Sequence, residues 1–176
     1  RAHAATDLAL RRRVDQLAAD ALFVLRFNAP DTGLGDHFLS AYRKALDTCA
    51  PTQVLHLCFL DRVAFALQSQ SAGQFVTDVN AVSDKATPIL FQRSPAAWAT
   101  HPQNYRELEH VGVRVGEMLF GIKLDFAWCH LALPAQRLKE ILPLIKRHDV
   151  GILAEVVVLL KDDLETREVD WLAWED

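Results

Sequence analysis

The sequence predicts an α/β fold in which helices cover a mostly parallel sheet of five strands. Strand-like apolar runs alternate with amphipathic helical patterns, which is the rhythm of β–α–β units. The run at 152–159 is apolar on both faces, as in parallel strands that helices cover on both sides. Hydrophobic residues make up 51% and charged residues 24% of the 176 residues, which is ordinary for a single globular domain spanning 1–176. The predicted strands are 22–28, 54–60, 89–93, 126–133 and 152–159.

The first elements follow from the spacing of apolar residues. A helical pattern covers about 7–20, and strand 22–28 comes directly after it. Turn-forming residues then lead into an amphipathic helix that carries Phe38 and Tyr42 on one face. Pro51 ends that helix, and the second strand follows.

The middle of the chain is less regular. Residues 62–71 fit a helix capped by Asp61, although their apolar residues also alternate as in a strand. Strand 89–93 stops at a well-marked helix start. There, Ser94 is a good N-cap and Pro95 suits the first helical position.

The last elements have clear ends. Asn104 with Glu107 resembles a capping box, and Gly121 closes the same helix in the usual glycine position. Pro134 begins a further helix between the fourth and fifth strands. An α+β fold is the alternative, with 125–160 forming one β–α–β half of a ferredoxin-like unit.

Composition excludes several classes of function. The net charge of −4 gives no electrostatic basis for nucleic-acid binding, and no apolar run approaches the length of a membrane span. The odd number of cysteines predicts reduced thiols and a cytoplasmic location. Cys58 and Cys129 lie in apolar strand patterns, so we expect both to be buried. The chain starts at Arg1 without a methionine, which indicates either a processed chain or a fragment of a longer chain.

Polar residues gather at the carboxyl ends of the predicted strands, where open parallel sheets bind ligands. This asymmetry predicts a ligand site, although helix capping by Asp61 and Ser94 explains part of it. The strand-end residues are Arg26, Asn28, Asp61, Arg62, Gln92, Arg93, Ser94 and His130.

The arginines are the sharpest signal in this set. Arg26 and Arg93 share strand faces with aliphatic and aromatic residues, and a buried arginine needs a partner. The partner is either a ligand phosphate or carboxylate held by the planar guanidinium, or an acid of the protein such as Asp31 or Asp61. The turn containing Gly33 and Gly35 precedes a helix, whose N-terminus attracts anions.

Metal binding and catalysis have weaker support. His56, Cys58, Cys129 and His130 supply at most three of the four ligands usual for zinc, so we expect no metal site. His130 and Asp61 are the candidates for proton transfer, but no nucleophile–base pair can be named. The sequence identifies no cofactor.

Two functional hypotheses remain open. In the first, the strand ends bind or transform a small anionic metabolite that is phosphorylated or bears a nucleotide; if it is an enzyme, a transferase is the expected class. In the second, the chain is a non-catalytic regulatory or assembly domain of a larger protein. The C-terminal Trp171 and Trp174 would then contact a partner domain or a second copy.

Overall fold

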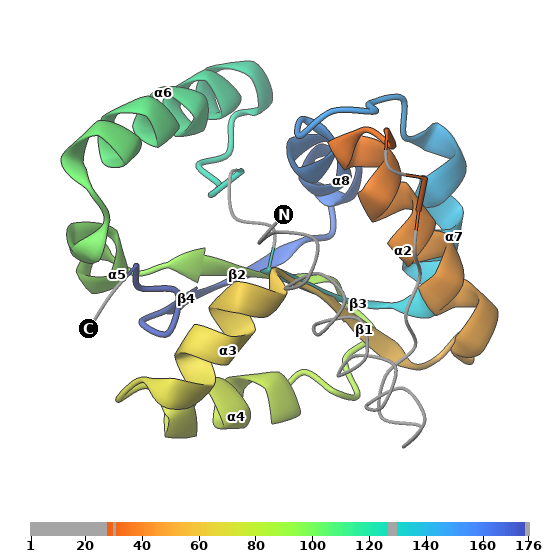
Figure 1. Ribbon diagram of the computed structural model, residues 1–176, viewed down its shortest axis with the longest axis horizontal. Coiled ribbons are helices and arrows are strands. Elements are labelled where there is room, and N and C mark those ends of the chain that lie inside the picture. Colours follow the sequence, from red (N-terminus) through yellow and green to blue (C-terminus); the bar gives the residue numbers. More distant parts are fainter. Residues whose placement is uncertain (1–27, 30, 127–129, 175–176) are drawn as a thin grey trace, which may run out of the picture. The chain divides into compact units, whose positions relative to one another are not determined.

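A computed structural model describes residues 28–29, 31–126 and 130–174 (Figure 1). The chain divides into two compact units, 1–32 and 33–176. The predicted helix 7–20 and all but the last residue of the predicted strand 22–28 lie outside the described residues. All helices and strands of the described residues belong to the second unit.

Four strands form one mixed sheet in the described part of this unit, in the order β1-β3-β2-β4. The strands are β1 (Val54–Leu57), β2 (Ile89–Arg93), β3 (His130–Pro134) and β4 (Glu165–Val169). β3 is antiparallel to both β1 and β2, whereas β2 and β4 are parallel. The fold class is therefore α+β, and the predicted mostly parallel sheet of five strands is wrong.

The predicted strand direction was wrong, because an apolar strand shows that both of its faces are covered and does not show whether it runs parallel to its neighbours. The central strands β2 and β3 are apolar on both faces, since helices cover both sides of the sheet. β3 nevertheless runs antiparallel, with Leu131 opposite Leu57 on one side and Leu90 on the other. The edge strand β4 was missed because it is mostly polar and exposed, which is common at a sheet edge.

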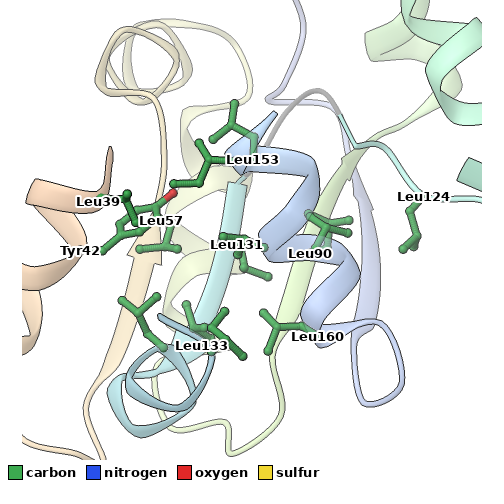
Figure 2. Packing of buried hydrophobic residues seen from close by; sticks show 14 residues of the cluster. Leu39, Tyr42, Leu57, Leu90, Leu124, Leu131, Leu133, Leu153 and Leu160 are labelled. Atoms are coloured by element: carbon green, nitrogen blue, oxygen red, sulfur yellow. The ribbon is translucent and has the colours of Figure 1, made fainter. Parts of the chain in front are cut away.

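One face of the sheet packs against α2 (Leu34–Thr48), α7 (Ala135–Ile141) and α8 (Ile152–Leu160), as Figure 1 shows. In Figure 2 the leucines of the strands meet Leu39, Leu153 and Leu160 of these helices. Those from the strands are Leu57, Leu90, Leu131 and Leu133.

The opposite face packs against α3 (Leu60–Gln68), α4 (Ala72–Asn80) and the C-terminal segment. Trp171 is 1% exposed and lies edge-on to Phe75 and Phe91. Its indole Nε1 donates a hydrogen bond to the Asp78 carboxylate at 3.0 Å. Trp171 is therefore part of the core of this unit.

The predicted strand 152–159 is instead the helix α8, and this is the largest correction. Its buried residues recur at helical spacing, but a helix buried on most sides shows no polar face that would reveal the period. Tertiary packing therefore overrides the β-propensity of its valines. Glu155 accepts hydrogen bonds from the backbone amides of Lys146 and Arg147, which ties the preceding loop to the helix. Because 152–160 is a helix, 125–160 does not form the predicted β–α–β half of a ferredoxin-like unit.

The predicted helix ends were partly right. Ser94 caps α5 (Pro95–Thr100), as predicted, by accepting a hydrogen bond from the Ala97 amide at 3.1 Å. α6 (Gln103–Phe120) ends at Gly121, whose φ of 71° is the left-handed conformation that favours glycine. The predicted capping box is wrong, because Pro102 is the N-cap of α6 and no side chain caps it.

The bounds of β1 and α3 also differ from the prediction. β1 ends at Leu57 and α3 begins at Leu60, which resolves the ambiguous segment as a helix. The predicted Asp61 cap is wrong, because Asp61 lies in the first turn of α3 and Phe59 is its N-cap. α7 follows Pro134 as predicted, and the short 3-10 helix η1 (Leu142–Leu144) continues it. Among the described residues, no helix has the length and apolarity needed to cross a membrane.

Candidate ligand-binding cleft

A cleft of about 410 Å³ lies at the carboxyl end of β2, between that strand end and the helices α5 and α6. Apolar side chains form part of its wall, including Pro95, Trp98, Val113 and Leu124. The charged side chains in the wall are Arg93, Arg106, Lys123, Asp125 and Glu168. A cleft of this size accommodates a small metabolite.

Arg93 is fixed in the wall of the cleft by two carboxylates. Its Nε and Nη2 donate to the two oxygens of Asp125, each at 2.7 Å, and its Nη1 donates to Glu109 at 2.6 Å. The guanidinium carbon lies 3.5 Å from the centre of the Trp98 ring, and the side chain is 0% exposed. Arg93 is therefore paired with acids of the protein, which was one of the two predicted alternatives. The acids are Asp125 and Glu109, however, and not Asp31 or Asp61.

The neighbours of Arg93 in the sequence also position the walls. The Gln92 side-chain oxygen accepts a hydrogen bond from the backbone amide of Asp125 at 2.8 Å, which holds the segment after α6 against β2. Ser94, besides capping α5, donates a hydrogen bond to the Asp170 carboxylate. Gln92 and Arg93 line the cleft.

Two other cations, Arg106 and Lys123, line the cleft. Neither Arg106 nor Lys123 makes an ion pair with any described residue. The Nε of Arg106 is buried and has no hydrogen-bond partner in the described structure. Arg93 is balanced by Asp125 and Glu109, so the other charges of the lining are these two cations and Glu168. Arg106 and Lys123 are therefore lining cations that no carboxylate of the described residues engages.

An aromatic surface adjoins these cations. The rings of Trp98 and His110 stack with their centres 4.5 Å apart and their planes 22° apart. The spacing of Arg106, His110 and Val113 places all three on one face of α6, toward the cleft. The cleft thus combines cationic and flat apolar groups.

Asp61 and Arg62 do not join this cleft. Arg62 is paired with the exposed Asp61 at 3.2 Å and donates to the Trp174 carbonyl oxygen at 3.3 Å. Asn28 belongs to the first unit, and Arg26 lies outside the described residues.

The glycine turn packs against another loop. Gly33 is the N-cap of α2, and the Gly35 amide donates to the His148 carbonyl oxygen at 3.2 Å. A Cβ on Gly35 would lie 2.3 Å from the His148 carbonyl carbon, so only glycine permits this approach. The turn is therefore occupied by protein backbone, and neither glycine lines the cleft.

His130 lies in an aromatic cluster on the α3–α4 side of the sheet. It is 0% exposed, and its ring centre is 5.5 Å from that of His56 and 5.6 Å from that of Trp171. Neither ring nitrogen has a hydrogen-bond partner in the described structure. Burial lowers the pKa of His130 to about 3 and that of His56 to about 4, so both rings are neutral at pH 7. His130 does not line the cleft.

The cysteines differ from expectation. Cys58 is exposed, so its predicted burial is wrong, while Cys129 lies outside the described residues. Neighbouring protein atoms still raise the pKa of the Cys58 thiol by desolvation. Among the described residues, no cluster of three or more histidine, cysteine or acidic side chains is arranged to hold a metal ion.

The sequence interpretation missed Trp98, Arg106, His110 and Lys123. A signal for two of them was present, because Arg106 and His110 are four residues apart on a predicted helix that follows a strand end. Lys123 gave no signal, since nothing in its local sequence shows that the segment after α6 returns to β2.

Comparison of the chain with protein-family models, with curated proteins and with solved structures gives no match.

Proposed function

We propose that the cleft binds a small organic anion, such as a phosphorylated metabolite or a nucleotide. Its anionic group would pair with Arg106 and Lys123, and its apolar or aromatic body would lie along Trp98 and Leu124. Arg106 and Lys123 carry this proposal, because both line the cleft and neither makes an ion pair with a described residue. A phosphate or carboxylate would pair with both side chains.

The charges of the cleft favour a ligand of this class. Arg106 presents planar donors suited to a phosphate or carboxylate, and Lys123 adds a mobile point charge. Arg93 cannot turn toward a ligand without releasing two buried bonds to Asp125, so its role would be to hold the wall. Arg106 and Lys123 therefore take the anion-binding role that the sequence suggested for Arg93.

The proposal is limited to binding. His130 and Asp61, the residues considered for proton transfer, lie outside the cleft. Binding at this site would serve an enzyme or a ligand-sensing domain equally well.

A thermal-shift panel with phenyl phosphate, AMP and inorganic phosphate tests the proposal. A ligand that binds only the folded protein raises its melting temperature, so phenyl phosphate or AMP should do so. Phenol, which lacks the anionic group, should not. Arg106→Ala and Lys123→Ala should each reduce the shift. Arg43→Ala, on an exposed position of α2 outside the cleft, should leave the shift unchanged.

Two outcomes would contradict the proposal. One is the absence of a shift with every anion of the panel. The other is a shift of equal size in the wild type and in a protein carrying both Arg106→Ala and Lys123→Ala, which would place the ligand elsewhere.

A further inference from the structure

The outer side of α6 is an exposed apolar stripe. Its most exposed members are Met118 at 86%, Leu108 at 71% and Leu119 at 70%. The full stripe consists of Tyr105, Leu108, Val111, Val115, Met118 and Leu119. The cleft residues of α6, Arg106 and His110, do not belong to it. Patches of this kind, several hundred Å² in extent, usually mark interaction surfaces.

The stripe has the dimensions of a helix–helix interface. α6 has 18 residues, which correspond to a length of about 27 Å, and the stripe covers most of it. Gly112 lies beside the stripe, and a Cβ placed there would meet nothing within 4 Å. A second helix could therefore approach the backbone closely at this point.

The charges beside the stripe specify how a second helix would run. Glu107 and Arg114 are seven residues apart and so lie on nearly the same flank, one on each side of Val111. In a parallel copy of α6 the two Glu107–Arg114 flanks would lie on opposite sides of the interface and would not meet. An antiparallel copy would bring Glu107 of one chain close to Arg114 of the other, twice in each pair.

We propose that α6 is the interface of an antiparallel homodimer whose two-fold axis passes near Val111 and Gly112. This alignment sets Leu108 against Val115 of the second copy and Tyr105 against Met118 of the second copy. It buries the apolar stripe and forms two interchain ion pairs between Glu107 and Arg114. The proposal is independent of ligand binding in the cleft.

Sedimentation velocity over a range of protein concentrations tests the dimer. The wild type should be dimeric in the micromolar range. Leu108→Glu should weaken dimerisation about 100-fold or more, because it places two charges in the apolar interface. Leu60→Glu is the matched control, since Leu60 is also 71% exposed but lies on α3, and it should have no effect.

A charge exchange tests the antiparallel alignment. Arg114→Glu should weaken the dimer about tenfold by creating two repulsive pairs with Glu107. Adding Glu107→Arg to Arg114→Glu should restore the wild-type affinity. A wild type that stays monomeric at roughly 100 µM would overturn the proposal. A dimer that survives Leu108→Glu, or one that the exchange fails to restore, would also overturn it.

Discussion

Replacing Arg93 with alanine should destabilise the protein strongly in the absence of any ligand. The substitution removes three hydrogen bonds to two carboxylates and leaves Asp125, which is 4% exposed, without its cation. Removing one partner of a buried ion pair costs about 3–5 kcal/mol, because the remaining charge stays desolvated. Glu109, at 16% exposed, regains water more easily and should add little.

Urea unfolding monitored by circular dichroism measures this loss, and a double-mutant cycle identifies its origin. Arg93→Ala combined with Asp125→Ala should lose less stability than the two single losses added together, because the buried Asp125 carboxylate is no longer left without a cation. Arg93→Lys should recover only part of the loss, since an ammonium cannot donate to both Asp125 oxygens in the same geometry. A loss below about 1 kcal/mol for Arg93→Ala, or additive losses in the cycle, would refute the structural role.

Three other features give predictions of their own. The pKa values of His56 and His130, lowered to about 4 and about 3, mean that the unfolded chain binds more protons below its histidine pKa of about 6.5. The free energy of unfolding should therefore fall as the pH drops from 6.5 toward 4, by about 2 kcal/mol per histidine at pH 5. His130→Leu should flatten the dependence of the melting temperature on pH over that range. An unchanged dependence in this variant would contradict the lowered pKa of His130. Gly35→Ala should cost about 1–3 kcal/mol in urea unfolding, because its Cβ would meet the His148 backbone, whereas Gly73→Ala, with open space around it, should be neutral or stabilising; equal effects would contradict the close approach. Cys58 is exposed, so a bulky maleimide should label it in the native protein, and protection of this thiol until unfolding would contradict its placement.

Local signals in the sequence were reliable where short-range chemistry decides the structure. The Ser94 cap and the left-handed Gly121 depend on neighbours within a few residues, and the structure confirms both. β2 was predicted at its observed bounds because a short apolar strand precedes that helix start. In contrast, α8 looks like a strand because it is buried on most sides, and burial removes the polar face that distinguishes the two periods.

Only some residues of the candidate site could be predicted from the sequence, because the others reach it through tertiary structure. Gln92 and Arg93 lie at the strand end where ligands were expected, and they do line the cleft. Their chemistry depends on Asp125, which is 32 residues from Arg93 and joins it only through tertiary structure. Arg106 and Lys123 also reach the cleft through tertiary structure, so no local pattern could show which cations line it.

Isothermal titration of phenyl phosphate tests the central claim, that the cleft binds organic anions, most directly. The wild type should bind one equivalent saturably, and the affinity should fall as the salt concentration rises, because the contacts to Arg106 and Lys123 are electrostatic. The protein carrying both Arg106→Ala and Lys123→Ala should show no saturable heat while keeping the wild-type circular dichroism spectrum. Equal affinity in the two proteins, or no binding by the wild type at low salt, would contradict the claim that this cleft is an anion site.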